Sequence, residues 1–405
     1  MSQIDKIIGY KKEVERLQSV CDFLKNTSKY AKASVELPTC MLVYGPMGVG
    51  KTMMAEALAA DCDRDVFRIC VKTDSISRIQ REFKLARKSA NAIVLIDDVD
   101  YLDLEHDGDI FELIDYEIDR CESGDVFVVL TADAKENLPK YLLNAIDADM
   151  VMELNPPTIE EACVIFQPIF DKYNLSSDFN AEDFCCFVID RTYAYVEDIF
   201  NKAARIVLYE NCEQISMKHL VKAVLLMKNY ELPTQLDVGT AYHEVGHAVV
   251  HLLLGGEAAC IVLYGDCGGY FEEMHWKEDS YRDVERRYMV RAAGKACEEI
   301  YSKTYSLGSD KDLKSLAEDI AKDVKVFATQ GFEYFSPIEL NSPAYNDALN
   351  KKVQSDLQKY YDKAKELLLA NMPLVEKLVE GLKDKFYLLH SEIYAIYNAY
   401  KNAKN

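Results

Sequence analysis

Long apolar runs are missing from this sequence of 405 residues. The nearest approach to one, residues 248–264, is interrupted by His251, Gly255, Gly256 and Glu257. A helix that spans a bilayer needs about 20 consecutive apolar residues. We therefore expect no segment of this chain to cross a membrane.

Basic residues are few relative to acidic ones. Lys and Arg number 47 against 68 Asp and Glu, which gives a formal net charge of −21. Such a chain repels phosphate backbones and anionic lipid, so we expect it to bind neither nucleic acid nor a membrane surface. Many of the acids lie in residues 97–125, which we predict to be a solvated helix face and its loop.

The sequence also lacks any CxxC pair, although it contains 12 cysteines. Several of them lie in or beside apolar runs, where a free thiol behaves as a small hydrophobic side chain: Cys40, Cys70, Cys163, Cys185 and Cys260. No signal peptide follows Met1. We therefore expect free thiols and a reducing, cytoplasmic compartment.

The first 150 residues alternate between two patterns. Short, wholly apolar segments predict strands at 40–44, 66–71, 92–96 and 126–131, and amphipathic segments predict helices at 13–25, from 51 onward and at 76–90. Apolar strands that alternate with helices indicate a parallel sheet covered on both faces.

The rest of the chain is predicted to be mainly helical. Four short helices are expected at 159–172, 181–190, 196–210 and 217–228, and a polar linker follows at 229–237. One β segment is expected at 260–271, and apolar stripes at 353–367 and 389–400 indicate buried helix faces. The chain therefore divides into residues 1–155, 156–230 and 231–405.

A glycine-rich loop follows the first predicted strand and opens a helix. It has the pattern G-x-x-x-x-G-K-[ST] and consists of Gly45, Pro46, Met47, Gly48, Val49, Gly50, Lys51 and Thr52. The glycines let backbone N–H groups surround phosphates, the lysine neutralises the terminal ones, and the threonine hydroxyl can hold Mg²⁺. The loop predicts a site for ATP and Mg²⁺.

Two acids at the end of a strand support this prediction. The apolar segment 92–96 leads directly into Asp97 and Asp98. Asp97 would hold the metal ion through water, and Asp98 stands where a general base for the attacking water is expected.

A second motif lies in the last part of the chain. His243, Glu244 and His247 form an HExxH pattern inside a predicted helix at 240–254. The spacing of four residues puts both imidazoles on one helix face, where they can share a Zn²⁺ ion, and Glu244 can act as the general base for its water.

The third zinc ligand has several candidates. His251 continues the helical ladder but would crowd the same face, and His275 lies in a predicted loop. Asp312 opens a later helix and can complete a His₂Asp site that leaves a fourth position to water, with Asp310 as the competing acid. Glu298 or Glu299 could support the histidines from behind.

Together these motifs resemble the FtsH family of AAA+ ATP-dependent zinc proteases. Residues 240–249 look like the zinc helix of that family, 294–300 are similar to the segment before its distal ligand, and 309–313 resemble its ligand turn, in which the aspartate binds zinc. That likeness favours Asp312. Residues 329–332 and 370–372 are also similar to family segments.

The resemblance implies a fold class and an assembly. The fold would be an α/β P-loop AAA+ nucleotide-binding domain at 1–155 with a helical lid at 156–230, followed by a mainly α-helical zinc metalloprotease domain at 231–405. The family acts on protein and peptide substrates as a ring-shaped hexamer, so a homo-oligomer is expected.

Several departures from the family pattern concern the ATPase module. The family has N-terminal transmembrane helices, whereas here the module begins almost at Met1. The family places an aromatic pore loop after the second strand, whereas residues 71–77 pass directly into a helix. Asp98 replaces a glutamate, and Asp133 is the nearest match to a conserved polar asparagine that follows the fourth strand.

The arginine fingers of the family are also missing. Residues 143–150, where they are expected, contain no basic side chain. An arginine finger contributes about 10³–10⁵ in rate where it has been measured, so we expect slow hydrolysis. Two hypotheses follow: an ATP-dependent or ATP-regulated zinc endopeptidase, or a nucleotide-binding scaffold ring with weak hydrolysis that presents a peptidase to unfolded chains.

Overall fold

The computed structural model describes residues 2–89, 91–102, 107–121, 124–265, 267–274, 281–304, 310–326 and 343–404. The chain forms two compact units: unit 1 comprises Met1–Pro168 and Asp190–Val196, and unit 2 comprises Ile169–Ile189 and Glu197–Asn405. Each unit buries its own set of apolar side chains. This division falls inside two helices, α7 (Ile159–Phe170) and α9 (Tyr193–Tyr209), so the limits of the lid remain a prediction.

Unit 1 is built on a five-stranded sheet in the order β2-β3-β4-β1-β5, in which all neighbouring strands are parallel. Its strands are β1 (Cys40–Tyr44), β2 (Asp65–Cys70), β3 (Ala92–Asp97), β4 (Val126–Ala132) and β5 (Val151–Glu153). Every residue of β1 and β4 is buried, because helices cover both faces of the sheet. The predicted parallel α/β sheet is confirmed; β5 was not predicted, because three residues are too short for a periodic signal.

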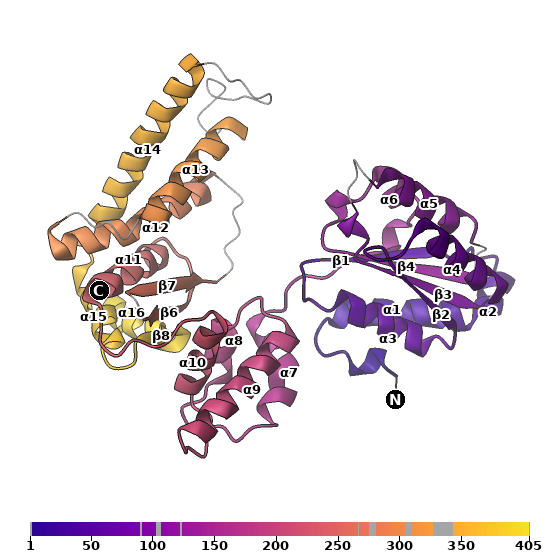
Figure 1. Cartoon of the computed structure of the whole chain (residues 1–405), viewed down its shortest axis with the longest axis horizontal. Helices are drawn as coiled ribbons and strands as arrows, with labels where there is room; N and C mark the ends of the chain where they lie inside the picture. The colour runs from indigo at the N-terminus through magenta and orange to yellow at the C-terminus, as the bar shows by residue number, and fades with distance from the viewer. Residues whose placement is uncertain are drawn as a thin grey trace. The chain divides into compact units, whose positions relative to one another are not determined.

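The described helices of unit 1 are α1 (Lys11–Lys25), α2 (Thr27–Lys32), α3 (Lys51–Asp61), α4 (Ile76–Ser89), α5 (Gly108–Asp119), α6 (Lys140–Asn144) and the first part of α7, with 3₁₀ turns at Ile4–Lys6, Val99–Tyr101, Lys135–Asn137 and Ala148–Met150. Figure 1 shows α1 and α3 on one face and α5 and α6 on the other.

The acidic segment at 97–125 contains the predicted helix, α5, but its face is only partly solvated. Glu117 is 4% exposed and lies 2.5 Å from Nη1 of Arg87 on α4. The prediction of a solvated face was therefore wrong for this residue, because an acid of α5 faces the neighbouring helix and is paired there. Asp103 and Glu105 lie outside the described residues.

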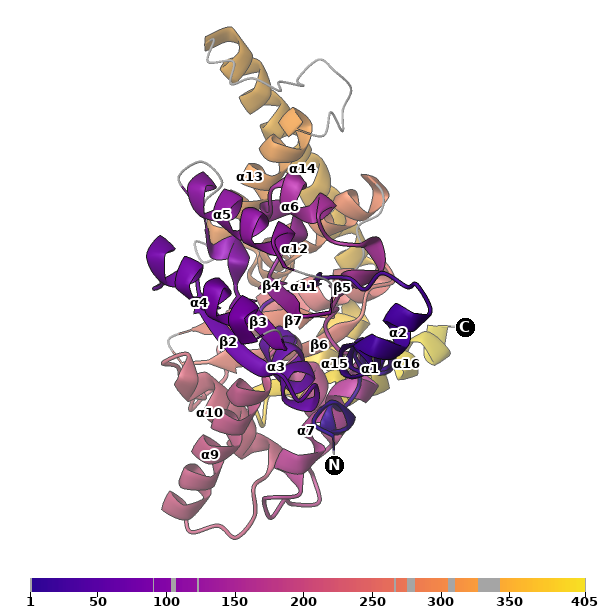
Figure 2. The same cartoon turned by 90° about the vertical axis from the view of Figure 1, so that its right-hand side faces the viewer.

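Unit 2 is mainly helical and has one small antiparallel sheet. Its helices are the end of α7, α8 (Ala181–Phe187), most of α9, α10 (Met217–Met227), α11 (Val238–Leu253), α12 (Tyr281–Ser302), α13 (Asp310–Val326), α14 (Pro343–Leu369), α15 (Met372–Leu382) and α16 (His390–Lys404). In Figures 1 and 2, α13 and α14 run side by side.

The sheet of unit 2 has the order β7-β6-β8. β6 (Ala258–Tyr264) and β7 (Gly268–Glu273) form an antiparallel hairpin, and β8 (Tyr387–Leu389) adds to the other side of β6. The single β segment predicted at 260–271 is therefore two strands. β8 was not predicted, because its partner lies more than 100 residues earlier in the chain.

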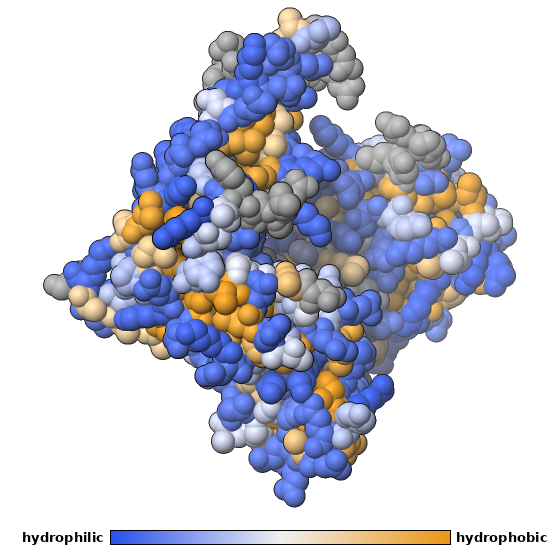
Figure 3. Space-filling model, turned by 60° about the vertical axis from the view of Figure 1, so that its left-hand side comes forward, coloured by the Kyte–Doolittle hydropathy of each residue, from blue (hydrophilic) through white to orange (hydrophobic). Residues whose placement is uncertain are grey.

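The remaining predictions about packing agree with the structure. Val353, Tyr360 and Ala364 of the first apolar stripe are buried, as are Ile393 and Tyr400 of the second. The 12 cysteines, all within the described part of the chain, form no disulfide bonds. None of the helices in the described residues combines the length and apolar character that a membrane span requires. The face drawn in Figure 3 is largely hydrophilic, with scattered apolar patches.

The contact between α11 and α12 in unit 2 depends on a glycine. A Cβ atom at Gly246 of α11 would lie 2.5 Å from the Cβ of Cys297 and 2.7 Å from the carbonyl oxygen of Ala293, both on α12. We expect Gly246→Ala to push these helices apart and to reduce the free energy of unfolding by about 1–3 kcal/mol, which is typical of overpacking. Thermal unfolding followed by circular dichroism measures this effect.

Gly108→Ala is the matched control, because a Cβ there meets no atom of the described residues within 4 Å. It should leave the transition unchanged or raise it slightly. Equal stability of the two variants would contradict the overpacking argument.

Candidate metal and nucleotide sites

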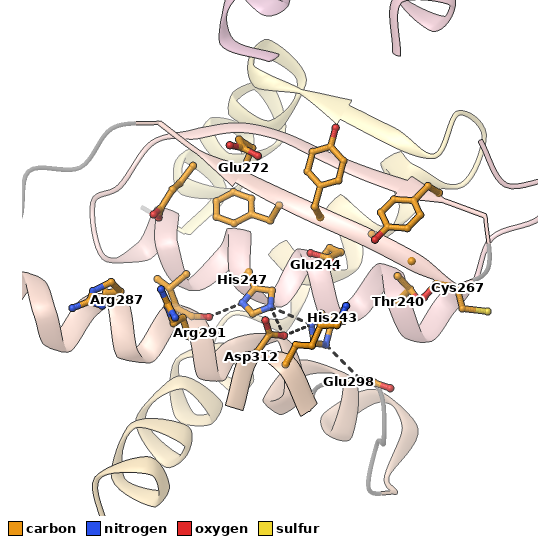
Figure 4. A pocket seen from close by; sticks show the side chains of 18 residues that line it. Thr240, His243, Glu244, His247, Cys267, Glu272, Arg287, Arg291, Glu298 and Asp312 are labelled. Atoms are coloured by element: carbon orange, nitrogen blue, oxygen red, sulfur yellow. Dashed lines mark hydrogen bonds and ion pairs between the residues drawn. The ribbon is translucent and has the colours of Figure 1, made fainter. Parts of the chain in front are cut away.

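The helix α11 presents two histidines on one face. It begins after Asp237, whose carboxylate caps the helix by accepting a hydrogen bond of 2.8 Å from the backbone N–H of Thr240. His243 and His247 follow one turn apart and project in the same direction (Figure 4).

Asp312 of α13 lies between these two imidazoles. Its Oδ2 atom is 2.9 Å from Nε2 of His243 and 3.5 Å from Nε2 of His247, and the two Nε2 atoms are 3.2 Å apart. Ligand atoms around a tetrahedral zinc ion lie about 3.3 Å apart, given bonds of about 2.0–2.2 Å. The three side chains therefore have the spacing that a zinc site requires.

Hydrogen bonds behind the histidines set their orientation. Nδ1 of His247 donates to the carbonyl oxygen of Val290 at 2.7 Å, which leaves Nε2 as the ring nitrogen that faces Asp312. Nδ1 of His243 lies 3.5 Å from Oε2 of Glu298. Glu299 instead pairs with Lys295 at 2.9 Å, so Glu298 alone of the two predicted acids lies behind a histidine.

The helix α12 leaves room for the site through Gly294. A Cβ atom there would lie 2.3 Å from Nε2 of His247 and 2.7 Å from Nε2 of His243. Any side chain at this position would occupy the space between the imidazoles and Asp312. The residues present therefore fit a bound metal ion, and the glycine keeps its place open.

The charges at the site depend on one another. Burial raises the pKa of Asp312, but hydrogen bonds from His243 and His247 lower it more, so the net pKa lies well below the usual range. Burial lowers the pKa of His247, but the hydrogen bond and the charge of Asp312 raise it more, so the pKa of His247 is raised overall. An anionic carboxylate between two imidazoles is the donor set that Zn²⁺ prefers.

Glu244 lies beside this cluster and faces β7. Its side chain is buried, and burial raises the pKa of its carboxyl, opposed in part by the charges of His247 and His243. A Cβ at Gly269 of β7 would lie 2.6 Å from Cγ of Glu244, so the strand passes directly over the acid. The pocket around them has a volume of about 820 Å³.

Of the other candidate ligands, only His251 has a described side chain, and it does not join the cluster. His251 is 0% exposed, with Nδ1 at 3.1 Å from Oε2 of Glu273 and Nε2 at 3.2 Å from the carbonyl oxygen of Glu257. Asp310 begins α13, but its side chain lies outside the described residues, as do His275, Ser309 and residues 329–332.

The glycine-rich loop of unit 1 connects β1 to α3. Gly48 and Gly50 have φ angles of 90° and 98°, which favour glycine, and a Cβ at Gly48 would lie 2.2 Å from Cγ2 of Thr192. The hydroxyl of Thr52 donates to Asp97 at 2.9 Å. The predicted Mg²⁺ residues are therefore in direct contact, which fits a bound cation.

The other acids predicted here have cationic partners. Asp133 Oδ1 lies 2.6 Å from Nζ of Lys51. The carboxylate of Asp98 is paired with a different lysine: its Oδ2 lies 2.7 Å from Nζ of Lys72. This hydrogen bond raises the pKa of Lys72.

Several residues of both sites carried no signal in the sequence. Lys72 and the carbonyl group of Val290 become relevant only through tertiary contacts, and the family likeness of residues 294–300 did not indicate that Gly294 makes room for the site. Thr131, whose hydroxyl donates to Asp97, could have been found from its place at the end of the fourth strand.

The fold and these sites define the class of protein: a parallel α/β module with a P-loop, joined to a mostly helical region in which an HExxH helix brings two histidines close to an aspartate. Residues 41–154 match the AAA family, described as the ATPase family associated with various cellular activities. This segment contains the loop, Asp97 and Asp133.

Relatives match almost the whole chain. The ATP-dependent zinc metalloprotease FtsH of Streptobacillus moniliformis is 26% identical over 96% of this chain and 63% of its own length. The proteins of the same name from Caldicellulosiruptor bescii and Ruminiclostridium cellulolyticum are each 25% identical, over 95% and 94% of this chain and 70% and 69% of their own lengths. Over almost its whole length the chain is therefore similar to FtsH ATP-dependent zinc metalloproteases, and its residues 41–154 match the AAA family.

The prediction that Asp312 is the third zinc ligand can be tested by measuring metal content. We expect Asp312→Ala to lose most of its zinc, a larger effect than the roughly 10–100-fold loss of affinity that follows removal of an outer partner. Zinc per chain, measured by elemental analysis after dialysis, is the readout.

Asp310→Ala and His251→Ala serve as controls, and both should retain zinc. If Asp312→Ala retains zinc and one of the two controls loses it, the residue replaced in that control is the third ligand.

Proposed function

We propose that this chain is a zinc-dependent endopeptidase that acts on protein and peptide substrates, with a nucleotide-binding AAA+ module that regulates it. The observation that carries the proposal is the convergence of His243, His247 and Asp312 in a pocket beside Glu244. The names of the relatives support it.

The three convergent side chains would hold Zn²⁺, which supplies a Lewis acid when bound. Glu244 would take a proton from the attacking water and deliver it to the leaving amine nitrogen. Its buried position favours this role, because burial raises the pKa of the carboxyl and makes the carboxylate a stronger base near neutral pH.

The strand β7 is suited to position an extended substrate. It lies at the edge of its sheet, paired with β6 on one side, and it lines the pocket beside Glu244. An unfolded peptide can add to such an edge by main-chain hydrogen bonds. A substrate strand there would pass next to the catalytic carboxylate.

The nucleotide module would bind Mg²⁺ and ATP through Lys51, Thr52 and Asp97, with the backbone of residues 45–50 around the phosphates. We propose that nucleotide binding orders a homo-oligomeric, hexameric ring, as the family resemblance implies.

The second candidate function, a scaffold ring with weak hydrolysis, is favoured by two observations. Asp98 is paired with Lys72, which opposes its use as a base. The connection from β2 to α4 is only residues 71–75, folded into a turn in which Asp74 accepts a hydrogen bond from the backbone N–H of Cys70. A pore loop has no place in this turn.

The role of Glu244 has a direct test. Glu244→Gln should keep zinc and the fold but slow cleavage of an unfolded protein by about 10²–10⁴, the usual contribution of a general base. Cleavage rates and zinc content should be measured on the same preparation. Near wild-type cleavage by this variant would show that Glu244 is not the base.

Two substrates can test whether the AAA+ module uses ATP hydrolysis to unfold proteins or only orders the ring. At saturating nucleotide, ATP and a slowly hydrolysed analogue should support cleavage of a permanently unfolded protein about equally, because ordering rather than hydrolysis is required. A folded fluorescent protein with a disordered tag should resist cleavage with both nucleotides. Rapid ATP-dependent loss of its fluorescence would contradict the scaffold interpretation.

A further inference from the structure

The ammonium group of Lys51 is fully engaged inside its own loop. Nζ donates to the carbonyl oxygens of Gly45 at 2.8 Å and Pro46 at 3.1 Å, and to Oδ1 of Asp133 at 2.6 Å. An ammonium group has three protons, so each has an acceptor. The side chain of Lys51 is only 6% exposed, whereas that of Asp133 is 52% exposed.

A nucleotide at this loop would have to share Lys51 with Asp133. The lysine of such a loop reaches the β- and γ-phosphates. Two acceptors of one ammonium lie about 5 Å apart, so a terminal phosphate oxygen bound to Nζ would come that close to the Asp133 carboxylate. Both groups are anionic, and like charges at this distance repel each other.

The backbone of Asp133 is held in place, which limits its retreat. The carboxylate of Asp100 accepts hydrogen bonds from the backbone N–H groups of Asp133 at 2.9 Å and Ala134 at 3.1 Å. The preceding residue, Ala132, is paired with Tyr44 across β4 and β1 and accepts a hydrogen bond from the N–H of Gly45. Asp133 is thus attached to the strand beside the loop.

The neighbouring acids are placed differently. Asp97 contacts the hydroxyls of Thr52 and Thr131, the position suited to Mg²⁺. Asp98 is paired with Lys72. Asp133 is therefore the acid whose cationic partner, Lys51, would also bind an incoming phosphate.

We propose that Asp133 makes this site selective for nucleoside diphosphates over nucleoside triphosphates. A diphosphate brings only its β-phosphate to the loop amides and Lys51, whereas a triphosphate adds a γ-phosphate and its negative charge beside the Asp133 carboxylate. The proposal rests on the proposed nucleotide binding and identifies the class of nucleotide that the resting site prefers.

Equilibrium titration of the purified full chain tests this selectivity. Affinities for Mg·ADP and for a non-hydrolysable ATP analogue with Mg²⁺ should be measured by competition with a fluorescent ADP. We expect the diphosphate to bind wild type about tenfold more tightly or better, given the repulsion at this distance. In Asp133→Asn the triphosphate analogue should gain most, so that the two affinities become nearly equal.

Two variants separate the explanations. Glu136→Gln removes the same charge from an exposed position three residues along and should keep the wild-type ratio. Lys51→Ala should lose both nucleotides. Thermal unfolding of Asp133→Asn should confirm its fold, because asparagine can still accept a hydrogen bond from Lys51.

Each outcome bears on a different claim. An unchanged ratio in Asp133→Asn, or an equal change in Glu136→Gln, overturns the selectivity while nucleotide binding stands. Failure of wild type to bind either nucleotide overturns the proposed nucleotide function and the selectivity together.

Discussion

The close contact between α11 and α12 is the constraint on which the metal site depends. Gly246 lets the two helix backbones approach, and Gly294 leaves the space in front of both imidazoles open. The same approach brings the carbonyl group of Val290 to Nδ1 of His247. This helix–helix packing therefore keeps the site open and orients His247. The four-residue spacing within α11 sets the separation of the two histidines, and α13 supplies Asp312.

Glu244 acquires its properties from the opposite side of α11. The hairpin of β6 and β7 covers it, and Gly269 permits the strand to lie against its side chain. Burial by this strand raises the pKa of the carboxyl. In the function proposed above, the strand that would align a substrate is thus also the strand that raises the pKa of the proposed base, so substrate position and basicity would depend on one packing contact.

The nucleotide site has a different electrostatic character. Lys51 is paired with Asp133, and Lys72 is paired with Asp98. Such pairing reduces the positive charge that the loop offers to phosphate and reduces the basicity available for hydrolysis. The metal cluster has the spacing that zinc requires, whereas the nucleotide loop resembles a binding site in which the catalytic groups are already engaged with each other.

Much of this protein was predictable from local sequence patterns. The parallel sheet, the helices at 159–227, the loop at 45–52 and the HExxH helix follow from periodicity and spacing, because these depend on residues close together in the chain. The proximity of His243 to Asp312 was suggested by family likeness, and the assignment of Asp312 as a ligand stays a prediction. The burial of Glu117, the strand β8 and the pairing of Lys72 with Asp98 were decided by tertiary structure alone, because each joins segments whose approach no local pattern encodes.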